Sequence, residues 1–261
     1  MNIAIDLVGT NLGSGTKTYN TNFLNQLMKS KQQDQIYVFI CNDYLKNITT
    51  KSIPKNILLK KKSNFLKINF LKIIWMQLIF PFELSLLNVE KLFSPMNYCP
   101  VFCRILKIKI ILGIHSNLPW VYFNKMPGSK IKNLLIKKLM EISIKYCDQI
   151  IVNSNFAKYE IIKCLNLKDK KIQVVYLGAD SEDEFDNIDS TDIKNFNYES
   201  QYILCVSSFV RYHNFITILE SFKKILYKDK KNIKLVLISQ VLDKEYFLEI
   251  KEYISKNFKN K

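Results

Sequence analysis

The stretch IIVNSNFAKYEIIKCLNLKDKKIQVVYLGAD, residues 150–180, decides the fold. Runs of β-branched residues predict buried strands at Gln149–Val152 and Ile172–Val175. The residues between them predict a helix over 155–165, because its apolar side chains keep helical spacing: Phe156, Tyr159, Ile162 and Leu165. A strand, a helix and a second strand in this order form a βαβ unit, in which the two strands run parallel in one sheet.

The same alternation of strands and helices precedes this stretch. Strand candidates are Ile3–Leu7, Ile36–Ile40, Lys91–Phe93 and Lys109–Ile114, and helix candidates are Thr16–Lys29 and Lys130–Tyr146. The first helix gathers its apolar residues on one face: Tyr19, Phe23, Leu24, Leu27 and Met28. The pattern predicts an α/β fold, with a mostly parallel sheet that helices cover on both faces.

The chain changes character after Asp180. Aspartates recur every third residue from Asp180 to Asp192, without the glycine and the residue order of a calcium loop, so residues 181–200 are expected to be an acidic linker. Strand and helix patterns then resume, at 202–206, 215–227, 233–238 and 244–258. We therefore predict an N-terminal Rossmann-like domain over 1–180 and an incomplete second Rossmann-like domain over 201–261.

The composition narrows the function classes. The net charge is +16, and because Arg104 and Arg211 are the only arginines, 39 − 2 leaves 37 lysines. Proteins that bind nucleic acids usually include arginine for bidentate contacts to bases and phosphates. With only two arginines, a nucleic-acid partner is not expected. Six cysteines include no Cys-x-x-Cys pair, which favours reduced thiols in a cytoplasmic protein. The first residues predict a strand and not a signal peptide.

The segment from Lys60 to Leu87 is apolar, but lysines and other polar residues interrupt it too often for a membrane span. One or two amphipathic helices are expected here. With Lys60, Lys61 and Lys62 just before them, they could lie on an anionic membrane surface. The alternative is a core helix with a solvated lysine face.

Polar clusters follow the predicted strands, where ligands of parallel α/β sheets bind. Gly13, Ser14 and Gly15 follow the first strand, and they could present backbone N–H groups to a phosphate or equally serve a tight turn. The remaining candidates follow later strands: His115, Asn153, Ser154, Ser207, Ser208, Arg211, His213 and Asn214.

Residues 150–180 resemble the middle of family 4 glycosyltransferases of the GT-B fold. In that family a strand ending in Asn-Ser or Thr-Ser precedes a helix, and a run such as Val175–Asp180 closes the N-terminal domain. The resemblance implies a GT-B-like architecture, truncated here within its C-terminal domain.

The resemblance also implies roles for the candidate residues. His115 would align donor and acceptor, although Ser116 stands where the family usually has Asp. Asn153 and Ser154 would face the acceptor or the cleft. The donor diphosphate would be held by Gly13, Ser14 and Gly15 and by the second-domain residues Ser207, Ser208, Arg211, His213 and Asn214. His213 replaces the family's lysine, so Arg211 could supply the missing cation. The family's pair of acidic residues has no counterpart before the chain ends.

The implied function is transfer of a sugar, with retention, from a nucleotide diphosphate sugar to a polysaccharide or lipid-linked glycan, such as bacterial lipopolysaccharide or capsule. No metal and no cofactor are implied, and the expected location is the cytoplasm or the inner membrane face. The alternative is a non-catalytic or split-enzyme subunit, which binds the acceptor or a second chain that completes the C-terminal domain. The chain alone is expected to be a poor transferase.

Overall fold

A computed structural model describes the chain except for residues 10–14, 48–52, 168–170, 179–200, 230–232 and 259–261. The chain divides into two compact units. Unit 1 comprises Met1–Trp120 and Leu135–Leu177, and unit 2 comprises Val121–Leu134 and Gly178–Lys261. The predicted linker, residues 181–200, lies outside the described residues.

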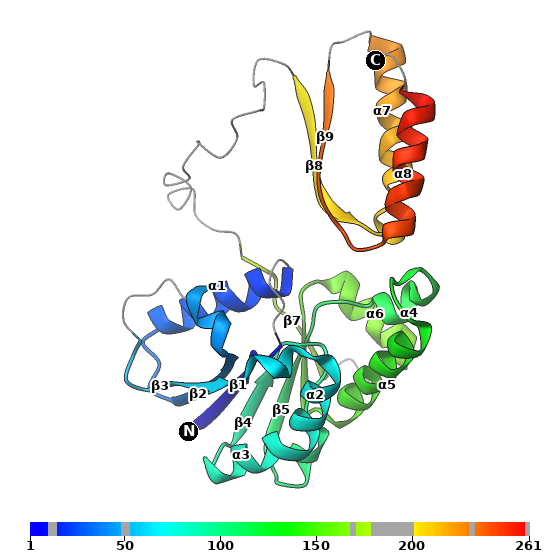
Figure 1. Ribbon diagram of the computed structural model, residues 1–261. Helices are drawn as coiled ribbons and strands as arrows, with labels where there is room; N and C mark the ends of the chain where they lie inside the picture. Colours follow the sequence, from blue (N-terminus) through cyan, green and yellow to red (C-terminus); the bar gives the residue numbers. More distant parts are fainter. Residues whose placement is uncertain (10–14, 48–52, 168–170, 179–200, 230–232, 259–261) are drawn as a thin grey trace. The chain divides into compact units, whose positions relative to one another are not determined.

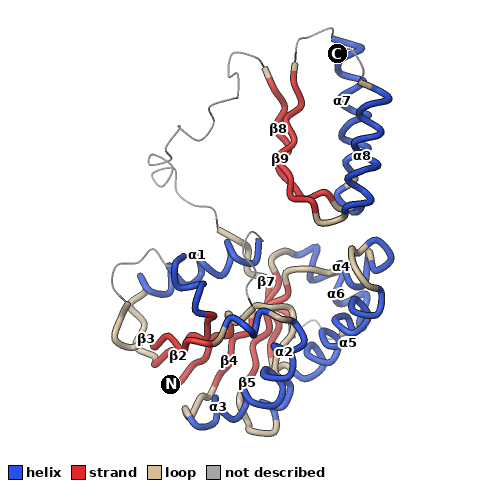
Figure 2. Tube along the Cα trace, in the orientation of Figure 1, coloured by secondary structure: helices blue, strands red, loops and turns tan. Residues whose placement is uncertain are grey.

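Unit 1 is built on a seven-stranded sheet with the order β3-β2-β1-β4-β5-β6-β7 (Figures 1 and 2). All neighbouring strands pair in parallel. The strands are β1 (Asn2–Asp6), β2 (Gln35–Cys41), β3 (Ile57–Lys62), β4 (Lys91–Ser94), β5 (Lys109–Ile114), β6 (Gln149–Val152) and β7 (Ile172–Val174). The strand order changes direction between β1 and β4, which makes their carboxyl ends the topological switch point of the sheet.

The predicted α/β class is confirmed, with six strands of unit 1 at or within about one or two residues of their expected positions. The sequence analysis missed β3, whose last residues are Lys60, Lys61 and Lys62. We expected these lysines to precede a surface helix, but they form an edge strand paired with β2. Lysines are common on edge strands because they discourage pairing with other chains.

Side chains that alternate along the strands point to the two faces of the sheet and form two separate hydrophobic cores. Ala4 and Val8 belong to one core, while Ile5 and Leu7 belong to the other. The smaller core lies against α1 (Gly15–Lys29) through Leu24 and Met28. The larger core receives side chains from the π-helical turn η3 (Trp75–Ile79), α3 (Phe80–Leu86), α5 (Lys130–Tyr146) and α6 (Asn155–Leu165). Successive strand residues point to opposite faces, with α1 packed on one face and the other helices packed on the second. The prediction that helices cover both faces of the sheet is therefore confirmed.

The helices of unit 1 start close to their expected positions, but the helix over 155–165 buries a different face from the expected one. They include α2 (Asn69–Ile74), α3 (Phe80–Leu86), α5 (Lys130–Tyr146) and α6 (Asn155–Leu165), with the short α4 at Leu118–Val121. On α6 the expected face was wrong, because Phe156 and Tyr159 are exposed and Ile161 is buried. Apolar residues surround most of this helix, so spacing alone did not identify the buried side.

The expected amphipathic segment folds as consecutive short helices. A 3-10 turn, η2 (Asn64–Lys67), leads into α2, a π-helical turn η3 (Trp75–Ile79) and α3. Gln77 on η3 donates to the Cys99 carbonyl at 3.0 Å and accepts from the Val101 N–H at 3.0 Å. These two hydrogen bonds fix the segment to η4 (Val101–Arg104). None of the helices that the structure describes is long and apolar enough to cross a membrane.

Unit 2 contains a parallel pair of strands, β8 (Tyr202–Phe209) and β9 (Lys234–Val241), and two long helices, α7 (Phe215–Asp229) and α8 (Lys244–Asn257). Both helices lie on the same side of the strands (Figures 1 and 2). Their core includes Phe209, Phe215, Leu219, Tyr246 and Ile250. On the other side, Leu204, Val206 and Ile238 are half or more exposed.

The six cysteines are free thiols. Four are buried in unit 1, and burial raises the pKa of Cys103 to about 12 and that of Cys147 to about 11. Burial likewise raises the pKa of Cys99, whose backbone N–H donates to Ser143. Cys164, on α6, is exposed, and Cys205, on β8, is partly exposed.

Candidate functional site

The carboxyl edge of the unit 1 sheet brings together residues that follow β1, β4 and β5. His115 comes directly after β5, and its backbone N–H donates to Asn97 Oδ1 at 2.7 Å. Its ring packs against Tyr19 of α1, with 4.4 Å between ring centroids. The structure therefore brings His115 next to the start of α1, which follows the predicted glycine-rich loop. Of that loop only Gly15 is described, as the first residue of α1, while Gly13 and Ser14 lie outside the described residues.

The position of His115 depends on Gly113, which lies two residues before it in β5. A Cβ built on Gly113 would lie 2.9 Å from the Pro95 Cα and 3.6 Å from His115 Nε2. The first distance is shorter than any ordinary contact, so only glycine lets the turn after β4 approach β5 this closely. Gly113 thus sets the spacing between Pro95 and the imidazole.

The imidazole of His115 is half-buried. Burial lowers its pKa, because water no longer solvates the charged form, while the Pro95 backbone carbonyl opposes this shift. His115 Nε2 is buried and has no hydrogen-bond partner of ordinary geometry in the described part of the chain. Buried polar atoms without partners are uncommon in folded proteins. A neutral imidazole nitrogen in this state can exchange a hydrogen bond with a sugar hydroxyl.

Ser154 has a local structural partner. Its Oγ accepts a hydrogen bond from the Ala157 N–H at 3.1 Å and caps the N-terminus of α6. Such a cap typically stabilises a helix by about 1 kcal/mol. Asn153, the residue before it, is half-buried in the turn after β6. That these two residues contact an acceptor stays a prediction.

In unit 2, a second cluster forms around His213. His213 Nδ1 lies 2.8 Å from Ser207 Oγ and 2.8 Å from the Ser208 carbonyl oxygen. Ser207 and Ser208 were expected after the strand, but β8 continues through both of them. Asn214 has a left-handed backbone, with φ of 51°, and it ends the turn η9 (Arg211–His213). The structure thus joins Ser207, Ser208 and His213 into one group.

Arg211 does not join this group. Its guanidinium donates to both carboxylate oxygens of Glu249 on α8, at 2.8 and 2.6 Å, and lies 3.7 Å from Asp243. The hydrogen bonds to Glu249 raise the pKa of Arg211, and they hold the pKa of Glu249 below its usual value. The cation that the sequence analysis assigned to a diphosphate is therefore neutralised inside unit 2.

The sequence analysis overlooked two buried charges at the switch point of unit 1. Asp6 ends β1 and is fully buried, and Lys72 on α2 is 2% exposed. The sequence did contain a signal for each residue: Asp6 ends an apolar strand, and Lys72 lies inside an apolar helix. The described residues contain no group of three or more His, Cys, Asp or Glu side chains that could hold a metal ion.

A protein-family model identifies the family of this chain. The model of glycosyltransferase family 4 matches residues 13–183, which is more than half of the chain. No curated protein sequence matches the chain.

Solved structures share the fold at low sequence identity. Alr3699/HepE of Anabaena, in complex with UDP and glucose, is 10% identical with a TM-score of 0.61, and the match covers 98% of this chain and 66% of that one. The lipopolysaccharide outer core galactosyltransferase WaaB is 15% identical with a TM-score of 0.51, covering 98% and 65%. A glycosyltransferase from Rickettsia africae is 16% identical with a TM-score of 0.58, covering 98% and 65%. The chain therefore spans just under two thirds of the length of these structures. Its fold is of the GT-B type, and the chain belongs to glycosyltransferase family 4.

Proposed function

We propose that the protein transfers a sugar from a nucleotide diphosphate sugar to a hydroxyl group of a glycan acceptor, with retention of the anomeric configuration. Family membership and the related structure with bound UDP and glucose support the reaction class. The observation that carries the proposal is the buried, unpartnered Nε2 of His115 at the carboxyl edge of the sheet, among the described residues. Its Nε2 would hold a hydroxyl group of the donor or acceptor in the orientation that the reaction needs.

The second-domain cluster would bind the donor diphosphate. Ser207 and His213 offer polar hydrogens to the oxygens of a diphosphate. Arg211 would add a bidentate contact only after leaving Glu249. Because developing negative charge on the leaving nucleotide needs stabilisation, a paired Arg211 predicts slow turnover by this chain alone.

The acceptor proposed here is a polysaccharide or a lipid-linked glycan, of the lipopolysaccharide or capsule type. Among the similar structures, WaaB is named a lipopolysaccharide outer core galactosyltransferase. An acceptor anchored in lipid would require the enzyme to reach a membrane surface from the cytoplasm.

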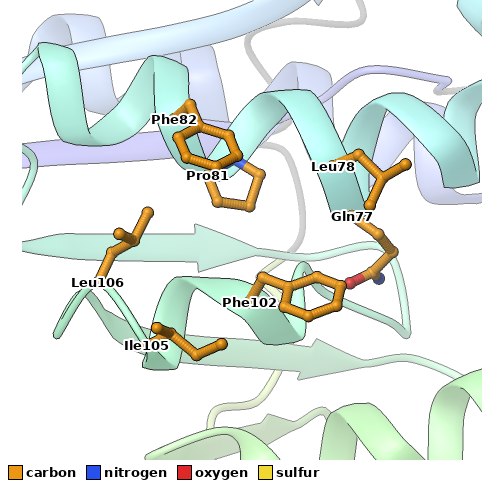
Figure 3. A pocket seen from close by; sticks show the side chains of 7 residues that line it. All are labelled: Gln77, Leu78, Pro81, Phe82, Phe102, Ile105 and Leu106. Carbon is orange, nitrogen blue, oxygen red and sulfur yellow. The ribbon is translucent and has the colours of Figure 1, made fainter.

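A membrane-facing surface is supported by an exposed apolar patch of unit 1, formed by Leu78, Phe82, Phe102 and Ile105. Figure 3 shows its central groove, of about 230 Å³, with Leu78 and Phe82 from one helical segment opposite Phe102 and Ile105. Exposed apolar clusters of this kind mark interaction surfaces. The membrane proposal rests on this patch.

The lysines contribute less to this surface than the sequence indicated. Lys62 is paired with Glu83 at 2.6 Å, and Lys67 is paired with Asp43. Lys60 lies 5.5 Å from the ring centroid of Tyr37. Lys61, by contrast, is exposed on β3. We therefore propose that apolar contacts provide most of the membrane affinity, and that unpaired surface charge adds a smaller, salt-dependent part.

The alternative function is a subunit that binds an acceptor, or a second chain that completes the C-terminal domain. It is favoured by the exposed side of β8 and β9, because parallel strands are normally covered on both faces. The test is turnover of nucleotide sugars by purified residues 1–261, alone and with the C-terminal third of a related enzyme.

A transferase should show sugar transfer that His115→Ala abolishes without changing the melting temperature. Loss of stability with intact turnover would make His115 a structural residue. If the chain shows no sugar transfer, alone or with the added C-terminal third, but binds a glycan tightly, the binding-subunit function is favoured.

A further inference from the structure

The most unusual side chain in unit 1 is Lys72. It is 2% exposed, and its Nζ has no hydrogen-bond partner among the residues that the structure describes. An ammonium group that leaves water loses strong solvation, and proteins normally return it through hydrogen bonds or ion pairs. A lysine buried without such partners costs stability, so its presence calls for another explanation.

The surroundings of Lys72 are shaped to accept it. Gly9, with φ of +79°, follows β1, and a Cβ there would lie 2.8 Å from Lys72 Cδ and 3.2 Å from Nζ. On the other side, the Tyr98 ring centroid lies 5.0 Å from Nζ, at a distance suited to a cation–π contact. The ammonium thus lies between the segments that follow β1 and β4, at the switch point of the sheet.

Asp6 compensates the charge only in part. It interacts electrostatically with Lys72, but the structure places no hydrogen bond between them. One carboxylate oxygen accepts from the Val8 N–H at 3.0 Å, and the other, Oδ2, has no partner among the described residues. All three hydrogens of the ammonium therefore remain available to a ligand that carries oxygen acceptors.

We propose that Lys72 is a binding residue for an oxyanion, a phosphate or a carboxylate, which enters at the carboxyl ends of β1 and β4. Ligands of parallel α/β sheets bind at this point. The four-carbon stem lets the ammonium turn toward the anion, which then supplies the missing acceptors. The inference deepens the proposed function and rests on it for the source of the oxyanion: the donor diphosphate or an acidic sugar of the acceptor.

The experiment measures anion binding by calorimetry on the 261-residue chain, with pyrophosphate and with glucuronate as probes. Lys72→Met should weaken binding of one probe by roughly 10- to 100-fold, as expected when a hydrogen bond to a charged group is lost. Lys72→Arg should retain most of the affinity. Lys61→Met, which removes an exposed lysine of the same charge, is the matched control and should bind like the wild type.

Preference for pyrophosphate would assign the site to the donor, and preference for glucuronate would assign it to the acceptor. The double variant Asp6→Asn with Lys72→Met, which removes both buried charges, should melt at the same temperature as the wild type or higher. Equal anion binding by Lys72→Met and Lys61→Met, or no binding of either probe to the wild type, would overturn the proposal. Binding is measured without turnover, so an inactive chain still gives a decisive result.

Discussion

Replacing Glu249 by Gln tests whether Arg211 belongs to a diphosphate site. The change removes the carboxylate that holds the guanidinium at 2.8 and 2.6 Å. Both side chains are substantially exposed, 37% for Arg211 and 51% for Glu249, so the lost ion pair should cost at most about 1 kcal/mol of unfolding free energy. The released guanidinium would gain a charged hydrogen bond to diphosphate, typically about 1.5–3 kcal/mol, which corresponds to roughly 10- to 100-fold tighter binding.

Calorimetric titration with UDP measures this effect directly. Glu252→Gln is the matched control, because Glu252 lies on the same helix but is paired with Lys256, at 2.6 Å, and not with Arg211. The control should leave UDP affinity unchanged. If Glu249→Gln binds UDP no better than the control, and Arg211→Ala binds no worse than the wild type, Arg211 has no part in donor binding.

Three further outcomes are expected. Gly113→Ala adds a methyl group 2.9 Å from a backbone carbon, so it should lower the unfolding free energy by about 1–3 kcal/mol, measured by urea titration; an unchanged midpoint would show that the turn relaxes freely. Leu78→Ser with Phe82→Ser should weaken binding to anionic vesicles several-fold in a sedimentation assay, whereas Phe156→Ser, on α6 and 69% exposed, should not; equal losses would disprove a specific patch. Burial raises the pKa of Asp6, so its contribution to stability is complete below pH 3.8 and declines as the pH rises through the folded-state pKa. The wild type should therefore lose stability relative to Asp6→Asn as the pH rises above 3.8, and a difference that does not vary with pH would contradict this account.

The sequence predicted the sheet better than the surfaces of the helices. Continuous β-branched runs identify buried parallel strands, which is why β5 and β6 were placed correctly. The edge strand β3 was missed because Lys60, Lys61 and Lys62 resemble a solvated basic segment. On α6, apolar residues occupy both sides, so the choice of buried face depended on neighbouring elements that spacing does not reveal.

The candidate site was predicted in part. His115 was singled out because a polar residue at the end of an apolar strand is conspicuous, and that it contacts a substrate stays a prediction. The pairing of Arg211 with Glu249 was not foreseen, because 38 residues separate them and only folding brings α8 beside η9. Lys72 was overlooked, since helical spacing cannot distinguish a lysine that faces the core from one that faces water.

The distribution of the thiols has a practical consequence for chemical labelling. Only the thiolate form of cysteine reacts with maleimides, and burial keeps Cys99, Cys103 and Cys147 protonated and shielded. In the native chain, Cys164 is the most accessible thiol among the described residues. A dye could therefore be attached to Cys164 on α6 without mutagenesis. Slower labelling of the buried thiols of Cys99, Cys103 and Cys147 would report the opening of unit 1.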